Sequence, residues 1–239
     1  MAQPDDGRTG PAGRTQAALL GLDELTRRLR RECPWDREQD ERTIVPHTVE
    51  EAYELADAAQ AGDDEKLLDE LGDVLFQVHF LALLLEERAA GSLAEVADHC
   101  SEKLIRRHPH IFSSAEVADA EEVLRNWDQI KRTEEGRDTL FGDLPENLPA
   151  LSRARKAQRR VASTGFDLPG LDGATATVRA ALDELDRAAP DREARFEEVG
   201  DVLFAVVNVA RKLGVDPELA LRAATARFTG RVGAAEAEA

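Results

Sequence analysis

A nine-residue sequence occurs twice in this chain and constrains the fold more than any other feature. Residues 70–78 read ELGDVLFQV and residues 198–206 read EVGDVLFAV, so seven of nine positions are identical at a distance of 128 residues. Solenoid repeats recur every ~20–50 residues, which is much closer together. The wide separation therefore indicates two duplicated domains within the 239 residues.

Both copies lie in segments with helical periodicity. Around the first copy, apolar residues recur at helical spacing from Leu67 to Val78, which predicts one buried face. Glu70 and Asp73 lie about one residue round from that stripe and should border the core. Similar spacing recurs along the chain from about Leu19 onwards, and no segment shows a convincing strand alternation. The sequence therefore predicts an all-α protein.

Composition marks the two ends and the middle of the chain. The first residues are rich in Gly, Pro, Asp and Arg and the last in Ala and Glu, so neither end can bury enough surface to become ordered. Residues 141–149 contain a glycine, two prolines and an asparagine, a composition typical of a linker. The expected organisation is a disordered segment at 1–18, a first domain at 19–138, a linker at 139–150, a second domain at 151–232 and a disordered tail at 233–239.

The overall charge argues against several classes of function. Acidic residues outnumber basic ones 48 to 31, which disfavours nucleic-acid or membrane partners and fits a protein that handles cations. Cys33 and Cys100 are too few for a disulfide framework and form no CxxC zinc motif. The N-terminus lacks the apolar core of a signal peptide, and the apolar runs are far shorter than the ~20 residues of a membrane span. We therefore expect a cytoplasmic protein.

Negative charge concentrates between Thr43 and Glu87, where twelve Asp and Glu residues accompany one basic residue, Lys66. Like charges on one helix repel each other unless a cation lies among them. Thr48, which follows Pro46, has a glutamate three residues later and is the expected start of the first acidic helix. The window therefore offers either a solvated acidic surface or a metal site.

Residue spacing within this window favours a metal site. Residues three apart on a helix share a face, so Glu51 with Glu54, and Glu70 with Asp73, form two carboxylate pairs. Two helices packed antiparallel would offer all four carboxylates to one or two ions, and oxygen ligands favour Mg²⁺ or Mn²⁺ over zinc. The sequence contains no Glu-x-x-His, phosphate loop or HExxH motif. An all-carboxylate site suited to phosphate chemistry remains.

A set of motifs distributed over about residues 19–232 resembles the MazG family of nucleoside triphosphate pyrophosphohydrolases. The motifs are Cys33-Pro34-Trp35-Asp36, Glu50-Glu51-x-x-Glu54, Glu70-x-x-Asp73, Arg106-Arg107-His108-Pro109-His110-Ile-Phe, Asn126-Trp127-x-x-Ile130-Lys131, Lys156-Ala-Gln-x-Arg159, Gly165-Phe-Asp and Glu198-x-x-Asp201. The resemblance implies two tandem MazG-like helical bundles that are completed when two chains form a homodimer. It also implies hydrolysis of NTPs and dNTPs between the α- and β-phosphates to the monophosphate and pyrophosphate, with nucleotide-pool housecleaning as the expected role.

The resemblance also implies roles for individual residues. The expected Mg²⁺ ligands, with Mn²⁺ as a substitute metal, are Glu51, Glu54, Glu70 and Asp73. Glu50 would be an extra ligand or would orient the attacking water. The expected phosphate contacts are Lys66, Lys103 and Arg107, with Lys131 as a further candidate. For Lys66 the alternative is an ordinary salt bridge with Glu70.

Trp35 and Trp127 are the two tryptophans of the chain. An indole can stack on a nucleobase, which makes both residues candidates for base contact. Packing in a core or an interface is the alternative for each.

The second half departs from the acidic pattern of the first. Ala180 and Ala181 stand where Glu50 and Glu51 are found in the first half, and alanine has no ligand atoms. We therefore expect catalysis to be confined to the first domain, with the second serving dimerisation or regulation. The alternative function for the whole chain is a non-catalytic regulator that binds a nucleotide or a basic protein. A nucleic-acid patch along residues 153–160 is a further alternative, which the surrounding negative charge disfavours.

Overall fold

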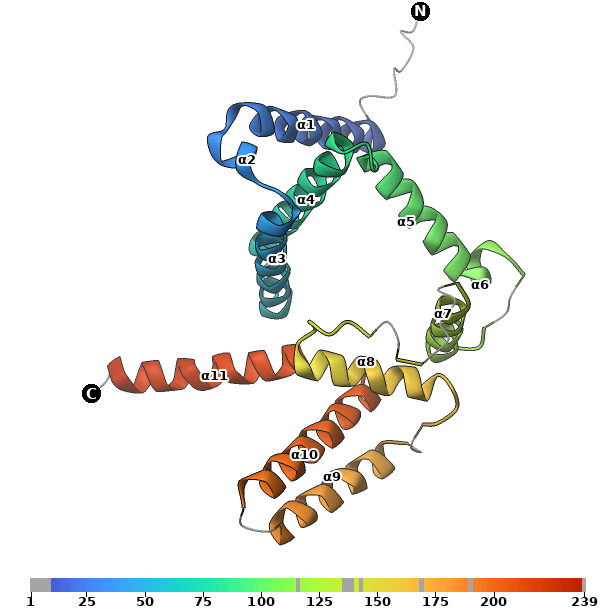
Figure 1. Ribbon diagram of the computed structural model, residues 1–239, viewed down its shortest axis with the longest axis vertical. Helices are drawn as coiled ribbons and strands as arrows, with labels where there is room; N and C mark the ends of the chain where they lie inside the picture. The colour runs from blue at the N-terminus through green and yellow to red at the C-terminus, as the bar shows by residue number, and fades with distance from the viewer. Residues whose placement is uncertain are drawn as a thin grey trace, which may run out of the picture. The chain divides into compact units, whose positions relative to one another are not determined.

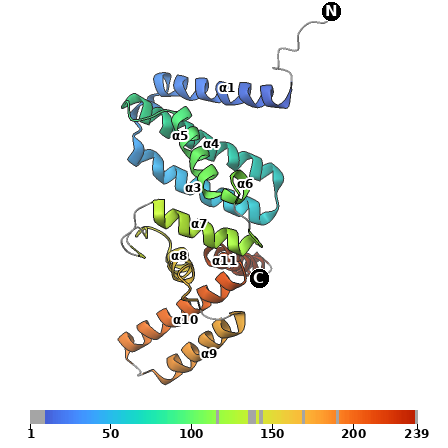
Figure 2. The ribbon, with the colours of Figure 1, turned by 90° about the vertical axis from the view of Figure 1, so that its right-hand side faces the viewer.

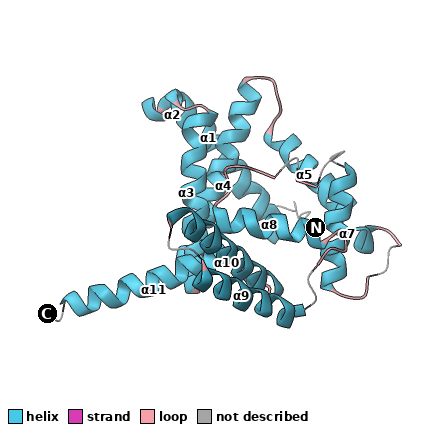
Figure 3. Cartoon of the chain, turned by 60° about the horizontal axis from the view of Figure 1, so that its bottom comes forward, coloured by secondary structure: helices cyan, strands magenta, loops and turns pink. Residues whose placement is uncertain are grey.

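The structure is a computed structural model whose described residues contain eleven helices. The described residues are 10–114, 117–134, 140–141, 144–167, 170–188 and 191–237. Every regular element in these ranges is a helix (Figure 3), which confirms the all-α prediction. None of the described helices combines the length and the apolar character needed to cross a membrane. The chain divides into two compact units, residues 1–105 and 106–239.

The first unit is built on a helical hairpin of α3 (Glu41–Ala61) and α4 (Asp64–Glu87), which lie side by side in Figures 1 and 2. Gly62 ends α3 in the left-handed conformation, with φ 69°, which glycine adopts without strain. Asp63 then caps α4 by accepting a hydrogen bond from the Lys66 backbone N–H at 3.0 Å. The tight turn makes the two helices antiparallel neighbours.

Helices α1 (Pro11–Glu32), α2 (Pro34–Glu38) and α5 (Leu93–Arg107) complete the first unit, and α1 packs on α2 and α4. The apolar core of this unit is small. Ile44 of α3 and Phe80 of α4 are fully buried, and Leu84 is 4% exposed. A small core of this kind fixes one part of the hairpin and leaves the rest to other interactions.

Charged contacts hold α1 against α4. The Arg27 guanidinium donates to Glu86 at 2.6 Å, and Arg30 donates to Glu87 at 2.9 Å. Arg30 also lies over the Phe80 ring, 5.8 Å from its centroid. The cationic last turns of α1 therefore bind the acidic end of α4.

The second unit contains a second hairpin, formed by α9 (Gly170–Arg187) and α10 (Arg192–Lys212) and visible in Figures 1 and 2. Helix α8 (Ala150–Ala162) packs against α10 and α11 (Pro217–Ala237). Helices α6 (Pro109–Phe112) and α7 (Ala120–Glu134) precede them. The two copies of the repeated sequence therefore occupy the same place, on the second helix of each hairpin.

The apolar stripe of α4 is oriented differently from our expectation. Leu71, Leu75 and Val78 are 50%, 37% and 38% exposed, whereas Glu70 and Gln77 are only 5% and 7% exposed. The stripe therefore points away from the hairpin, and polar side chains lie inside it.

Four apolar positions related by the 128-residue offset are exposed in both hairpins. They are Leu68, Leu71, Leu75 and Val78 in α4, and Phe196, Val199, Leu203 and Val206 in α10, with exposures between 37% and 76%. We call these two sets the apolar stripes of α4 and α10. The described chain leaves both of them uncovered.

Several element boundaries differ from those expected. Helix α1 begins at Pro11, earlier than residue 19, and α11 continues to Ala237, so both expected disordered ends are partly helical. Helix α3 begins at Glu41, where Asp40 and Thr43 form a capping box, so Thr48 lies inside the helix. The Cys33-Pro34-Trp35-Asp36 motif leads into the short helix α2.

The two units meet within α5, earlier than the expected linker at 139–150. Arg106 and Arg107, the last residues of α5, both bind Glu134 at 2.9 Å and so belong with the second unit. Residues 1–9, 115–116, 135–139, 142–143, 168–169, 189–190 and 238–239, which fall in the expected disordered segments, the linker and both expected domains, lie outside the described residues.

Candidate metal and active site

Three carboxylates come together where α3 and α4 face each other. Oxygen atoms of Glu51, Glu70 and Asp73 all lie within 4.8 Å of one another. Glu51 comes from α3, and the other two come from one face of α4 because they are three residues apart. We call these three residues the carboxylate cluster. They form a set of oxygen donors of a size suited to one cation.

The carboxylate cluster carries more negative charge than its neighbourhood balances. Burial raises the pKa of Glu70, and the charges of Glu54 and Asp73 raise it further. Lys66 acts in the opposite direction, since its Nζ lies 3.8 Å from Glu70 Oε1. Burial likewise raises the pKa of Glu51, followed by the charges of Asp73 and Glu54. A divalent cation would neutralise this repulsion, and the carboxylates would bind it.

The donor set fits Mg²⁺ or Mn²⁺. Mg²⁺ takes oxygen ligands and is usually bound through a few carboxylates, with water and substrate phosphates in its remaining positions. The cluster supplies carboxylate oxygens from both helices of the hairpin. One of them, Glu70, is buried, which makes an unbalanced charge there costly. The chemistry of the cluster therefore agrees with the predicted metal.

The predicted residues Glu54 and Glu50 lie differently. Glu54 is exposed and outside the carboxylate cluster, although its charge acts on both Glu51 and Glu70. Glu50 is also exposed, and its Oε2 lies 3.2 Å from Nδ1 of His47. Glu50 is therefore paired with His47 and is not a member of the cluster in this structure.

His47 is absent from the predicted site but connects two members of it. Its ring meets the Trp35 ring edge-on, with 5.8 Å between centroids, while Nδ1 contacts Glu50. Trp35 is 51% exposed, so its indole is available to a ligand. The position of His47, three residues before Glu50 on a helix, was the signal that could have identified it.

The predicted phosphate and base contacts are divided between the two units. Lys66 and Lys103 belong to the first unit, where Lys66 contacts the cluster and Lys103 lies half-buried on α5. In the second unit, Arg107 and Lys131 each place their cationic group 5.8 Å from the centre of the Trp127 ring. Arg107 is 8% exposed, which indicates that it also has a structural role in the second unit.

The second hairpin lacks the carboxylate cluster. Ala180 and Ala181 of α9 line a cavity of about 550 Å³ together with Glu184 and Asp201. Alanine offers no donor atom to a cation. Within the described parts of the chain, the cluster of the first unit is the single group of three or more metal-ligand side chains.

Comparison with known proteins shows that the segment containing the carboxylate cluster has counterparts in other proteins. The sequence profile of the MazG nucleotide pyrophosphohydrolase domain matches residues 39–112, which include the whole carboxylate cluster. The nucleoside triphosphate pyrophosphohydrolase of Escherichia coli K12 is 42% identical over 206 residues, covering 83% of this chain and 78% of that protein. The nucleoside triphosphate pyrophosphohydrolase/pyrophosphatase MazG of Thermotoga maritima is 40% identical over 201 residues, covering 83% and 77%. The similarity therefore extends well beyond the acidic hairpin.

Replacing Glu70 with glutamine is expected to stabilise the metal-free protein. The pKa of Glu70 is raised in the folded state, so its ionised form opposes folding. The penalty is absent below the ordinary value of 4.5 and develops as the pH rises through the folded pKa. The gain in Tm should therefore be larger at about pH 8 than at about pH 5. Calorimetry in the presence of EDTA measures both values.

Glu50→Gln is the matched control, because Glu50 is a neighbouring exposed residue outside the cluster. Its Tm should change little at either pH. A lower Tm for Glu70→Gln than for wild type at about pH 8 would contradict the electrostatic account.

Proposed function

The chain belongs to the MazG family of nucleotide pyrophosphohydrolases, and we propose that it hydrolyses nucleoside triphosphates between the α- and β-phosphates, releasing the monophosphate and pyrophosphate. The observation that carries this proposal is the carboxylate cluster, which lies inside the segment matched by the family profile. Names of the relatives from Escherichia coli and Thermotoga maritima support the same reaction. A role in clearing non-canonical nucleotides from the cytoplasmic pool fits this chemistry.

The carboxylate cluster would hold the metal, with Glu54 as the fourth carboxylate. Mg²⁺, when bound, would neutralise phosphate charge and lower the pKa of a bound water. The charge of Glu54 raises the pKa values of Glu51 and Glu70, which supports a place for Glu54 beside the cluster. Glu51, Glu54, Glu70 and Asp73 are thus the proposed ligands.

The remaining residues of the hairpin would bind and orient the substrate. Lys66, at the first turn of α4, is placed to exchange its partner Glu70 for a phosphate oxygen once a metal binds that carboxylate. Glu50 would add a ligand or orient the attacking water once its carboxylate is released from His47. Trp35 would offer its exposed indole to the base. The proposed substrate contacts outside the hairpin are Lys103, Arg107, Trp127 and Lys131.

The two hairpins would differ in their tasks. Catalysis is proposed for the first, since the second has alanines where the first has acidic residues. A regulatory role remains the proposal for the second, supported by the cavity that those alanines line.

Identification of the products tests the reaction. Incubation with a nucleoside triphosphate and Mg²⁺ should give equal amounts of the monophosphate and pyrophosphate, measured by ion-exchange chromatography. EDTA should abolish turnover, and Mg²⁺ or Mn²⁺ in excess should restore it. Release of orthophosphate and the diphosphate would show that a different bond is cleaved.

Substitution of the repeated glutamate tests where catalysis occurs. Glu70→Gln removes a charged ligand and should lower kcat/KM by about 100-fold or more. Glu198→Gln makes the same change at the matching position of the second hairpin and should leave kcat/KM within about twofold of wild type. A loss of activity in the Glu198 variant alone would place the reaction in the second hairpin instead.

We also propose that two copies of this chain associate through the apolar stripes of α4 and α10. Each stripe exposes four large apolar side chains along one helix face, and repeat-related positions are exposed in both. Contiguous apolar patches of this kind mark interaction sites. The pattern is therefore better explained by two covered surfaces than by chance exposure.

Charge placed in a stripe should separate the copies. Leu71→Glu combined with Leu75→Glu would bury two uncompensated carboxylates in the proposed interface and should give a monomer in sedimentation equilibrium. Leu20→Glu, on exposed α1, is the control and should keep the mass of the wild type. A monomeric wild-type protein would refute the proposed association.

A further inference from the structure

A polar pair, Thr48 and Gln77, lies inside the first hairpin and has no part in the reaction as proposed above. Gln77 of α4 is 7% exposed, and its Oε1 accepts a hydrogen bond from the hydroxyl of Thr48 of α3 at 3.4 Å. The same hydroxyl lies 3.3 Å from the Ile44 carbonyl, so its hydrogen is shared between two acceptors. Burying an amide costs free energy unless it is well hydrogen-bonded. An amide at this depth therefore indicates a task beyond packing.

The polar pair occupies the layer of the hairpin next to the carboxylate cluster. On α3, Thr48 is three residues before Glu51, and on α4, Gln77 is four residues after Asp73. Residues at these spacings share a helix face, so each member of the pair lies one turn from a member of the cluster. The fully buried core pair lies a further turn away on both helices. The polar pair therefore separates the carboxylates from the apolar core.

The amide of Gln77 has a donor available for the cluster. Its oxygen accepts from Thr48, while its nitrogen Nε2 makes no hydrogen bond within the described residues. Long side chains on a helix lean towards the preceding turn, which for Gln77 is the turn of Asp73. A glutamine and an aspartate four residues apart on a helix can form a hydrogen bond. The N–H groups of Gln77 should therefore face the cluster.

The second hairpin lacks the polar pair as well as the cluster. Val178 and Ala205 stand at the positions of Thr48 and Gln77, and Ala205 is 5% exposed. Both hairpins therefore have this interior layer, but it is polar only where the carboxylates are present. A layer that served packing alone would have no reason to be polar in one copy and apolar in the other.

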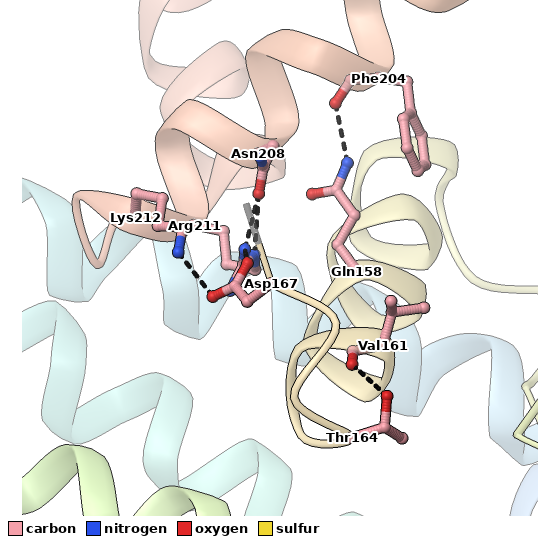
Figure 4. A network of polar contacts seen from close by, with 8 residues as sticks. All are labelled: Gln158, Val161, Thr164, Asp167, Phe204, Asn208, Arg211 and Lys212. Atoms are coloured by element: carbon pink, nitrogen blue, oxygen red, sulfur yellow. Dashed lines mark hydrogen bonds and ion pairs between the residues drawn. The ribbon is translucent and has the colours of Figure 1, made fainter. Parts of the chain in front are cut away.

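A buried amide of the second unit has a different setting (Figure 4). Asn208 is 8% exposed, and its oxygen accepts hydrogen bonds from the Arg211 guanidinium at 2.7 and 3.1 Å. Arg211 also donates to Asp167 at 2.5 Å, which ties the amide into a charged network at the end of α10. Within the described residues, the hydrogen bond of Gln77 is to the Thr48 hydroxyl alone. A structural network thus explains Asn208 and leaves the donor of Gln77 unexplained.

We infer that Gln77 is a positioning residue of the metal site, oriented by Thr48, whose Nε2 donates a hydrogen bond to the Asp73 carboxylate when that carboxylate binds the metal. The hydrogen bond would fix the side-chain rotamer of Asp73 and leave its other oxygen for the ion. Residues that orient metal ligands usually contribute about 10–100-fold to metal affinity or activity. The inference rests on the proposed function of the first unit, but metal binding tests it independently of the reaction.

Calorimetric titration of the full-length chain with Mn²⁺ measures this role. Gln77→Met removes the amide and keeps the length of the side chain, and Thr48→Val introduces the residue found in the second hairpin. Gln60→Met makes the first change at an exposed position of α3 and is the matched control. The Tm in EDTA and the rate of pyrophosphate release are measured for each variant.

Gln77→Met should bind Mn²⁺ about tenfold or more weakly than wild type and should lower kcat/KM by a similar factor. Its Tm in EDTA should be equal to or above that of wild type, because an apolar group replaces a poorly bonded buried amide. Thr48→Val should weaken Mn²⁺ binding by a smaller factor. It should have no further effect in the Gln77→Met background, because both residues act through one amide. Gln60→Met should match wild type.

Three results would overturn the inference. They are unchanged Mn²⁺ affinity in Gln77→Met, whatever its Tm, additive effects of the two substitutions, and no Mn²⁺ binding by wild type. If Gln77→Met fails to fold by circular dichroism, the Mn²⁺ affinity of Thr48→Val decides the question. Wild type that binds Mn²⁺ but releases no pyrophosphate would refute the proposed function, and the Mn²⁺ affinities would still decide the role of Gln77.

Discussion

The contact between α3 and α4 places charge where a helical hairpin ordinarily places apolar side chains. Glu70 is 5% exposed and lies among Glu51 and Asp73, so the hairpin closes against the mutual repulsion of three carboxylates. Such an arrangement persists only when other interactions compensate for it. The fully buried pair Ile44 and Phe80 provides this compensation within the hairpin. Ion pairs between α1 and α4 add to it from outside.

This constraint explains the orientation of α4. If the polar side faces α3, the apolar side must face elsewhere, and Leu71, Leu75 and Val78 are accordingly exposed. Helical periodicity identifies the stripe correctly but carries no information about which neighbour covers it. A stripe that packs on another chain has the same spacing as one that packs on the core of its own chain. Our expectation that the stripe faced the core was wrong for that reason.

The sequence contains local signals for much of the helical framework. Gly62 and Asp63 mark the turn of the first hairpin because left-handed glycine and an acidic cap are strong short-range signals. The expected start of α3 at Thr48, just after Pro46, was wrong. Asp40 and Thr43 form a capping box upstream, and the helix tolerates the proline one turn later. Competition between two local signals of this kind is decided by packing, which a sequence shows only indirectly.

The candidate site, like the fold, could be predicted from the sequence only in part. Helix spacing predicted that Glu70 and Asp73 share a face, and the structure brings both together with Glu51. Glu54, the fourth carboxylate of the prediction, lies outside this cluster. The pairing of Glu50 with His47 was not predicted, because it depends on a choice between side-chain rotamers. Arg107, Trp127 and Lys131 belong to the second unit, and the sequence did not predict this because the division between the units lies inside a continuous helix.

Comparison of the two copies of the repeat distinguishes the residues of the apolar stripe from those of the metal site. Both copies keep large apolar side chains at the positions that point outward. These are Leu71 and Leu75 in the first copy and Val199 and Leu203 in the second. On the neighbouring helix, acidic residues in the first copy correspond to Ala180 and Ala181 in the second. If the outward stripe existed only to support the metal site, it would have no reason to persist where the ligands are absent. The stripe therefore has a purpose separate from the metal site, which supports the proposed association of two copies.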